Sequence, residues 1–369
     1  MSDQGRALSL VVVVGPFPPP THGAAIITQR LTQRLKGRAA IVVVDTSPAS
    51  HRRTVGTHAR RFVCHAQAVV ALARHARRAR RSLYVACPGG RAIWYVTTLV
   101  AIGRALGYQT FVHHHSFSYL DRGSRAMALL TRLGSRSVTH VSLCTRMEGE
   151  LRKRYPKVEN AVVCSNAAFV TPLPAVAQRP NRSGLVLGHL GNLTFEKGLE
   201  EVLELLRTLR GTGLPVTLRL AGEPMSPDVA ATVRAAQREL GSALVVEGPA
   251  TGAEKDRFFS SIDLFVLPSR YVHEAEPLVV LEALAAGTPI VAIGRGCLAD
   301  GFSGAGRITD TSEDFVRIAA QYCRSLAEDG RGLDDQRRAV SAGFRRRRGA
   351  AEKALSDLVA VITAERERE

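Results

Sequence analysis

Two glutamates with a proline between them form the stretch of this sequence whose residue types and spacing could do chemistry. Glu274 and Glu282 stand eight positions apart, and Pro277 lies between them. Pro277 fits the first position of a helix, where its missing N–H costs nothing. The free amides near Leu278 and Val279 would then point out of the helix, where they could hold an anion such as a diphosphate.

The two carboxylates would lie on either side of that anion. Glu282, inside the helix, could accept hydrogen bonds from hydroxyls on one side of a diphosphate, and Glu274, in the preceding loop, could do so on the other. A nucleotide sugar has this order of groups, namely ribose, diphosphate and hexose. A buried amphipathic helix with two solvated glutamates has the same spacing, so the pair by itself leaves both interpretations open.

The segment from Glu274 to Pro289 resembles the donor-binding motif of the retaining glycosyltransferases of family 4, which have the GT-B fold. The family pattern is a Glu, seven residues, then Glu-Ala, small residues and Gly-Thr-Pro, and this chain has it as EAEPLVVLEALAAGTP. The resemblance implies that Glu282 binds the donor ribose and that Glu274 contacts the donor sugar as a catalytic residue. Ala275-Glu276 stands where the family more often has Gly-Phe, in the part that faces the transferred sugar.

A second segment resembles the loop with which the same family binds the donor diphosphate. Residues 191–198, GNLTFEKG, follow a predicted strand. The resemblance implies that Gly191, Asn192 and Lys197 belong to the donor-binding site and that Lys197 is catalytic, because a cation there neutralises the leaving group. The family has an arginine at the position of Asn192, so one charge on the diphosphate is absent or comes from elsewhere. Considered alone, a Lys-Gly pair more often begins a helix.

Two landmarks in the first half of the chain resemble the same family. Gly23 lies in a loop between a predicted strand and helix, and resembles the family's Gly-Gly step, which approaches the donor diphosphate. His115 ends the run His113–His115 after a predicted strand. A histidine there lines the cleft near the donor sugar in the family, so His115 is expected as a third catalytic residue. Shared metal binding by the three histidines is disfavoured, because adjacent side chains on a strand point to opposite faces.

The order of predicted elements indicates an α/β protein with two Rossmann-like, doubly wound domains. In the first half, the expected strands are Leu8–Val14, Ile41–Asp45, Leu83–Cys87, Thr110–His114, Val138–Leu143 and Ala161–Cys164. In the second half, they are Leu185–Leu190, Val216–Ala221, Ala243–Glu247, Leu264–Leu267 and Ile290–Ile293. Helical patterns separate these runs, as a parallel sheet requires.

A stretch rich in proline divides the predicted domains. Residues 173–183, LPAVAQRPNRS, are the expected linker. Residues 1–172 form the predicted acceptor-side domain, and residues 184–345 form the predicted nucleotide-sugar donor domain. The resemblance to the GT-B fold implies that the domains face a central cleft, and that residues 346–369 form a C-terminal helix that packs back on the first domain.

Basic charge is concentrated in the first half of the chain. The net charge is +17, and residues 1–183 hold 27 Lys and Arg against 6 Asp and Glu. One long basic helix is predicted over Arg52–Arg81, with arginines on its outer face. The apolar stripe predicted to face the core consists of Phe62, Ala66, Val69, Val70 and Ala73. We expect the basic face to contact an anionic membrane surface or a lipid phosphate, and solvated arginines without a partner are the alternative.

Composition is typical of a globular protein from a reducing compartment. Hydrophobic residues make up 45% of the chain, and no run reaches the roughly 18 apolar residues that a membrane-spanning helix requires. The six cysteines form no C-x-x-C pair, which predicts reduced thiols in a cytoplasmic protein. The basic first half is the reason to expect a peripheral location on the inner face of the membrane. No helix-turn-helix signal or RNA-binding motif is present, so nucleic acid is not an expected partner.

These features predict a retaining glycosyltransferase that moves a sugar from a nucleoside-diphosphate-sugar donor to a hydroxyl acceptor. The expected acceptor is a lipid-linked or saccharide intermediate of polysaccharide biosynthesis, or a natural-product aglycone. No cofactor or metal is expected, because the chain has no Asp-x-Asp motif to hold one. Two alternatives remain open, a nucleotide-sugar epimerase on the same double-Rossmann plan and a non-catalytic protein that binds anions or glycans.

Overall fold

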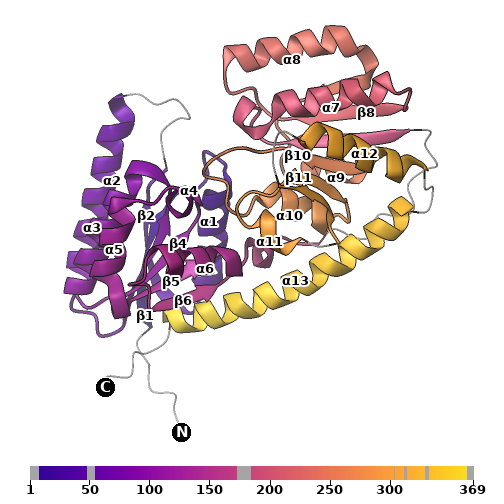
Figure 1. Ribbon diagram of the computed structural model, residues 1–369. Helices are drawn as coiled ribbons and strands as arrows, with labels where there is room; N and C mark the ends of the chain where they lie inside the picture. The colour runs from indigo at the N-terminus through magenta and orange to yellow at the C-terminus, as the bar shows by residue number, and fades with distance from the viewer. Residues whose placement is uncertain are drawn as a thin grey trace. The chain divides into compact units, whose positions relative to one another are not determined.

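The computed structural model describes residues 8–47, 55–172, 184–302, 304–310, 314–328 and 332–363 of the chain. The chain forms two compact units. Unit 1 comprises Met1–Phe169 and Ala351–Glu369, and unit 2 comprises Val170–Ala350. Each unit is built on a six-stranded parallel sheet with helices packed on it (Figure 1). The predicted linker, residues 173–183, lies outside the described residues.

The sheet of unit 1 has the strand order β2-β1-β3-β4-β5-β6. Its strands are β1 (Ser9–Gly15), β2 (Ala39–Asp45), β3 (Arg81–Cys87), β4 (Gln109–His114), β5 (Val138–Ser142) and β6 (Asn160–Val163). β1 is buried at every position, which explains why its sequence is a continuous run of valines rather than an alternating pattern. All six strands predicted from the sequence are confirmed to within two residues at each end.

The helices of unit 1 cover both faces of this sheet. They are α1 (Gly23–Leu35), α2 (Val55–Arg74), α3 (Ile93–Ala105), α4 (Ser118–Asp121), α5 (Arg125–Gly134) and α6 (Thr145–Arg154), with short 3-10 turns at Gly90–Ala92, Ser135–Ser137 and Asn166–Phe169. The long helix predicted over Arg52–Arg81 is wrong at its end, because α2 stops at Arg74 and the arginine-rich turn after it leads into β3 at Arg81. Residues 52–54 of that prediction lie outside the described residues.

The face that α2 buries is also different from the predicted one. The buried stripe is Cys64, Ala68 and Leu72, while Phe62 and Val70 are exposed over 66% and 63% of their surface. The helix carries two apolar stripes two positions apart, and two positions turn a helix by about 200°, so the stripes lie on nearly opposite sides. Hydrophobicity alone could not choose between them.

The sheet of unit 2 has the strand order β12-β11-β10-β7-β8-β9. Its strands are β7 (Leu185–Leu190), β8 (Val216–Ala221), β9 (Leu244–Glu247), β10 (Leu264–Leu267), β11 (Ile290–Ile293) and β12 (Gly306–Thr309). The five strands predicted in this half are confirmed to within one residue. β12 was not predicted, because its sequence GRIT is short and carries a glycine and an arginine.

Helices also cover both faces of the second sheet. They are α7 (Leu199–Gly211), α8 (Pro227–Leu240), α9 (Ala253–Ser261), α10 (Leu278–Ala285), α11 (Leu298–Gly301) and α12 (Phe315–Glu328), with 3-10 turns at Phe195–Lys197 and Gly241–Ala243. One large hydrophobic core joins the sheet to α7, α8 and α12. Both units therefore have the doubly wound α/β architecture that the sequence predicts.

One helix contributes residues to both units. α13 runs without interruption over Gly332–Thr363. Its first part belongs to unit 2, where Arg337 forms an ion pair with Asp263 at 2.5 Å. Its last part, from Ala351, belongs to unit 1, where the Ser82 hydroxyl donates a hydrogen bond of 2.7 Å to the Ile362 carbonyl. Residues 364–369 lie outside the described residues.

Four of the six cysteines are buried free thiols, namely Cys64, Cys87, Cys164 and Cys323. Burial raises the pKa of the Cys87 and Cys323 thiols to about 12, so these two are protonated at neutral pH and are poor nucleophiles. In the part of the chain that the structure describes, none of the helices combines the length and the apolar character needed to cross a membrane.

Candidate functional site

The centre of the unit 2 sheet is where a ligand site is expected in this architecture. β7 and β10 are neighbours there, β8 and β9 lie beyond β7, and β11 and β12 lie beyond β10. The order of the strands therefore reverses between β7 and β10. In open parallel sheets, ligands bind at such a switch point, outside the carboxyl ends of the strands. The loops after these two strands, residues 191–198 and 268–277, begin at that edge.

The two loops pack closely against each other because Gly198 has no side chain. Its φ is 86°, and a Cβ atom at this position would lie 2.4 Å from the Pro268 carbonyl oxygen. The amide of Arg270 also donates a hydrogen bond of 2.8 Å to the Glu196 carbonyl. The glycine of the Lys-Gly pair is therefore required for the close approach of the loops as well as for the positive φ.

Lys197 and Glu274 meet where these loops converge. The Lys197 Nζ lies 3.4 Å from the Glu274 Oε2, and the Ser269 hydroxyl donates a 3.1 Å hydrogen bond to the same oxygen. The Lys197 ammonium also lies 5.8 Å from the centre of the Tyr271 ring. Glu274 is buried and Lys197 is partly exposed. The structure thus brings together two predicted site residues that are far apart in the sequence, as a cation and a carboxylate at the same sheet edge.

The N-terminus of α10 follows Glu274 by a few residues. α10 begins at Leu278, and Pro277 is its N-cap with extended backbone angles, so the prediction that Pro277 is the first helical residue is wrong by one position. The reason is that the Pro277 carbonyl already accepts hydrogen bonds from the amides of Val280 and Leu281 at 3.1 and 3.4 Å, which is the N-cap role. No side chain of the described residues caps this helix. The amides of Leu278 and Val279 precede the first intrahelical donor and are available to an anion.

Glu282 lies within α10 and has one engaged and one unengaged oxygen. Its Oε1 accepts a hydrogen bond of 2.8 Å from the Lys255 ammonium. Its Oε2 is buried and has no hydrogen-bond partner among the described residues. A buried carboxylate oxygen without a donor is costly, so this atom is suited to accept a hydroxyl of a bound molecule.

Lys255, in the first turn of α9, is a charged residue of this site that the sequence reasoning missed. It lies 27 positions before Glu282 and carries no motif of its own. No periodicity connects a lysine on one helix with a glutamate on another, so only the folded structure reveals the pair. Its charge compensates the Glu282 carboxylate inside the unit.

Glu276 points to α13 rather than standing free in the loop. Its side chain is fully buried and forms an ion pair with Arg347, with 3.6 Å between the charged atoms. The Arg347 guanidinium also lies 4.0 Å from the centre of the Phe302 ring. Burial lowers the pKa of Arg347, and the neighbouring Glu276 carboxylate opposes this effect. The residue that departs from the family pattern therefore has a structural partner, Arg347, which no motif in the sequence indicates.

A third loop, after β11, fixes the Glu274 segment from the other side. Gly296 has a φ of 60°, and a Cβ atom there would lie 2.4 Å from the Ala275 carbonyl oxygen. The same carbonyl accepts a 2.8 Å hydrogen bond from the Cys297 amide, and the Arg295 guanidinium donates one of 3.1 Å to the Tyr271 carbonyl. The segment 271–275 is therefore held by hydrogen bonds from the loop after β11 to its backbone carbonyls.

The Gly191-Asn192 turn occupies the start of the loop after β7. Gly191 has a φ of 149°, and its carbonyl oxygen would lie 1.8 Å from a Cβ atom on Gly222. The Asn192 side chain is exposed. Because it is uncharged, Lys197 is the one cation of residues 191–198.

The candidate residues of unit 1 lie at the carboxyl edge of its own sheet. Gly23 is the first residue of α1, and the ring of His22 caps this helix by accepting a 3.4 Å hydrogen bond at Nδ1 from the Ala25 amide. His115 directly follows β4 and is half-buried. Its Nε2 is buried and has no hydrogen-bond partner among the described residues. Burial lowers the pKa of His115 to about 3, and the neighbouring His22 adds to this effect, so the ring is neutral at pH 7.

The other histidines near His115 are engaged in hydrogen bonds. The His113 Nδ1 lies 2.7 Å from the Tyr84 hydroxyl, and the His114 ring bridges the Tyr119 hydroxyl at 2.7 Å and the His140 Nδ1 at 2.9 Å. His113 and His115 lie on one side of the strand, with 4.3 Å between their ring centres. Within the described ranges, no group of three or more His, Cys, Asp or Glu side chains is placed to hold a metal ion.

Comparison with known proteins connects unit 2 to a family of enzymes. Residues 177–305 match the sequence model described as "Glycosyl transferases group 1", which supports the GT-B superfamily. Over 231 residues the chain is 29% identical to glycogen synthase of Mycobacterium tuberculosis, a match that covers 61% of this chain and 52% of that protein. It is 31% identical over 157 residues to 2-deoxystreptamine glucosyltransferase of Streptomyces kanamyceticus, covering 42% of this chain and 38% of the relative. The chain thus spans about half the length of the glycogen synthase that it matches.

Solved structures show the same fold over 96% of the chain. The structure of Anabaena HepE in complex with UDP and glucose is similar with a TM-score of 0.67 and 14% identity, covering 96% of this chain and 99% of that one. Sucrose-phosphate synthase from Thermosynechococcus elongatus gives a TM-score of 0.67 at 16% identity, covering 96% and 98%. The two-unit α/β architecture is that of GT-B glycosyltransferases.

Proposed function

We propose that this chain is a retaining glycosyltransferase, similar to those of family 4, that transfers a sugar from a nucleoside diphosphate to a hydroxyl acceptor. The observation that carries the proposal is the meeting of Lys197 with Glu274 at the switch point of the unit 2 sheet, next to the free amides of α10. A cation, a carboxylate and a helix N-terminus at one sheet edge supply what a sugar diphosphate needs, namely positive charge for the phosphates and acceptors for hydroxyls.

The donor diphosphate would bind to Lys197 and to the amides of Leu278 and Val279. Cleavage of the bond between sugar and phosphate builds negative charge on the leaving diphosphate, and fixed donors that face this charge stabilise the transition state. The Lys197 ammonium is bound to Glu274 in the free protein, so it is already positioned and needs only a small movement to reach a phosphate. No metal is part of this proposal.

The two glutamates would bind the groups on either side of the diphosphate. The unengaged Oε2 of Glu282 accepts a hydrogen bond from a ribose hydroxyl. Glu274 accepts a hydrogen bond from a hydroxyl of the transferred sugar once Lys197 has moved to the phosphate. In unit 1, the neutral His115 ring has an unengaged Nε2 that can form a hydrogen bond with a sugar hydroxyl. Retention follows from attack on the face of the leaving group, with the leaving phosphate accepting the proton of the acceptor hydroxyl.

The comparisons support a first choice of donor and acceptor for testing. The similar HepE structures contain UDP, UDP with glucose, or UDP-glucose, and the curated relatives are named as enzymes that build glycans or glycosylate a small aglycone. UDP-glucose is therefore the first donor to test. The proposed acceptor is a hydroxyl of a saccharide, a lipid-linked intermediate or an aglycone.

A thermal-shift screen with UDP, GDP, ADP, CMP and TDP, alone and as their sugars, with and without magnesium, tests the donor site. A ligand at 100 times its Kd adds about 2.7 kcal/mol to the free energy of unfolding. We expect one nucleotide to raise Tm without magnesium, Glu282→Ala to abolish this increase, and the exposed control Glu200→Gln to retain it. Absence of a shift with every nucleotide, in a folded sample, contradicts the proposal.

A transfer assay separates the enzyme from a binding protein of the same fold. Incubation with the nucleotide sugar selected by the screen should release the free nucleoside diphosphate, and Lys197→Ala should slow this release. Binding of the donor without release, in the presence of glycan, lipid and aglycone acceptors, would favour the non-catalytic alternative.

A further inference from the structure

The outward face of α2 combines exposed apolar side chains with unpaired arginines. Phe62, Val63 and Val70 project from this helix and are largely exposed. They occupy positions i, i+1 and i+8 of the helix, so they lie along one side of it. Large apolar side chains scattered singly on a surface need no explanation, but a row along one helix indicates an interaction surface.

A neighbouring helix also exposes a large aromatic side chain. Trp94, the one tryptophan of the chain, is exposed over 49% of its surface and belongs to the first turn of α3. The residue after it, Tyr95, packs its ring against His65 of α2 with 5.2 Å between the ring centres. Trp94 is therefore adjacent in sequence to a direct contact between α3 and the first half of α2. Tryptophan is the residue that proteins prefer at the boundary between lipid and water.

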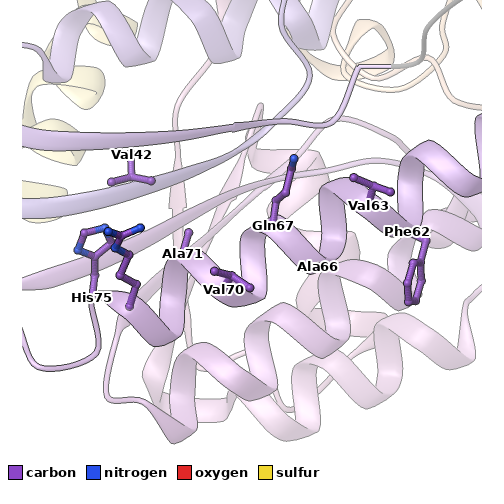
Figure 2. Close-up of a pocket in the computed structure, with 9 residues that line it drawn as sticks. Val42, Phe62, Val63, Ala66, Gln67, Val70, Ala71 and His75 are labelled. Carbon is purple, nitrogen blue, oxygen red and sulfur yellow. The ribbon is translucent and has the colours of Figure 1, made fainter.

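A shallow groove runs along the same face between α2 and β2. It has a volume of about 690 Å³ and is lined mainly by apolar side chains, Val42 from β2 and Val63, Ala66 and Val70 from α2, with Arg74 and His75 at the end of the helix. Figure 2 shows Val42 on the strand side and Val70 and Ala71 on the helix side of this groove. Among the described residues, the groove is bounded by the edge strand β2, so it opens at the margin of the unit 1 sheet.

The charges on α2 and on the turn that follows it are all positive, and the nearest acid on β2 is Asp45, whose carboxylate accepts hydrogen bonds from the Phe17 and Ser47 amides. From Thr46 to Leu120 the sequence holds eleven arginines and not one aspartate or glutamate. Arg61, Arg74, Arg77 and Arg78 are exposed, and within the described ranges none of these four forms an ion pair. An arginine that stabilises the fold forms an ion pair or a hydrogen bond. Arg60, for example, donates a 2.9 Å hydrogen bond to the Ser47 carbonyl.

We propose that this surface, formed by Phe62, Val63, Val70 and Trp94 with the exposed arginines around them, docks unit 1 onto an anionic lipid bilayer. The apolar side chains enter the boundary between headgroups and acyl chains, and the arginines bind lipid phosphates. A helix with one basic flank and one apolar face fits the plane of a bilayer better than it fits a nucleic acid, because the apolar row has no partner on a phosphate backbone. This proposal places the protein at a membrane surface, and it does not depend on which donor the proposed transferase uses.

Vesicle binding of the whole chain tests the proposal. We expect cosedimentation with vesicles of phosphatidylcholine containing about 30% phosphatidylglycerol, much weaker binding to pure phosphatidylcholine, and weakening at about 0.5 M salt. The fluorescence of Trp94 should shift to shorter wavelength on binding, because the indole enters a less polar environment. Equal binding to neutral and anionic vesicles, or no binding by a folded sample, overturns the proposal.

Two pairs of double variants separate this surface from general charge. Phe62→Ser with Val70→Ser, and Arg74→Gln with Arg78→Gln, should each weaken vesicle binding about tenfold or more. The matched controls are Leu129→Ser with Val162→Ser and Lys153→Gln with Lys157→Gln, which remove as many exposed apolar or basic groups from α5, β6 and the α6 region. All eight side chains are exposed, so the variants should fold, and circular dichroism checks this. Equal losses in the controls contradict docking by this surface.

Two other partners of this surface would give different results with the same variants. A second copy of the chain would produce a dimer in light scattering that Phe62→Ser with Val70→Ser abolishes, without vesicle binding by the wild type. If the partner were a nucleic acid, the arginine variant would lose affinity for it and the apolar variant would not. Either result, with wild-type chain that does not bind anionic vesicles, overturns the membrane proposal.

Discussion

The two units share one architecture but differ in how their charged side chains are paired. In unit 2, the carboxylates at the sheet edge have cations beside them, Glu274 with Lys197, Glu282 with Lys255 and Glu276 with Arg347. In unit 1, the corresponding sheet edge contains the neutral histidines His114 and His115, while the arginines on the outside of α2 have no acidic partners among the described residues.

This difference shows that the same fold can build two kinds of surface. Unit 2 holds compensated charges that a charged ligand can rearrange, as binding of a sugar diphosphate requires. Unit 1 holds neutral donors and acceptors inside and uncompensated charge outside, which suits hydroxyl groups at its sheet edge and an extended anionic surface at α2. The predictions below test each side of the comparison.

The largest effect is expected for the cation of unit 2. Lys197→Ala should lower kcat/KM, because the developing charge on the diphosphate loses its cation. The expected loss of transition-state stabilisation is about 2–4 kcal/mol. Steady-state kinetics with the donor identified by the nucleotide screen measures this. The control is Lys153→Ala in unit 1, which removes an exposed lysine of α6 and should leave kcat/KM unchanged. A Lys197→Ala variant that retains full activity would remove Lys197 from the site.

Acid should destabilise unit 1 through its buried histidines. Burial lowers the pKa of His140 to about 4, and the neighbouring Arg152 adds to this. In the unfolded chain the pKa is about 6.5. Because the unfolded state binds the proton more tightly, the free energy of unfolding is highest above pH 6.5 and falls as the pH decreases towards 4. His140 alone should contribute on the order of 2–3 kcal/mol to this loss.

Trp94 gives this acid prediction a local readout, because the one tryptophan of the chain lies in unit 1. Urea unfolding followed by tryptophan fluorescence between pH 7 and pH 4 should show the decrease. In His140→Gln the dependence on pH should be shallower. An unchanged slope in this variant would mean that His140 is not the group that titrates.

A smaller effect is expected from the lysine that compensates Glu282. Lys255→Met should lower the free energy of unfolding by about 1–2 kcal/mol, since a largely buried carboxylate loses its ion pair. Urea unfolding at pH 7 measures this value. Arg317→Met breaks the exposed pair with Asp314 on the same unit and should cost less than about 0.5 kcal/mol. Equal costs for the two variants would contradict the burial argument.

The fold was largely predictable because its signals are local. A run of valines such as β1 identifies a strand buried on both faces, and the order of strands and helices along the chain determines the doubly wound class. The short strand β12 escaped detection because a glycine and an arginine interrupt its pattern.

The candidate site was predictable only where a motif lies within one segment. Glu274 and Glu282 belong to a pattern of sixteen letters and could be proposed from the sequence. Their partners Lys255 and Arg347 come from helices remote in the chain, and nothing in the sequence links such pairs. The buried face of α2 was mistaken for a related reason, because two apolar stripes compete and only the packed sheet and α3 decide between them.

The path of α13 has a consequence for how the chain is synthesised. Unit 1 is discontinuous, because its helices and strands before Phe169 are joined by the segment from Ala351, which buries Leu355, Leu358 and Ile362. A ribosome releases the chain from its N-terminus, so unit 1 emerges first but lacks this segment until all of unit 2 has been made. Unit 2 is continuous and can complete its core earlier. The half that is made first is therefore the half that is finished last.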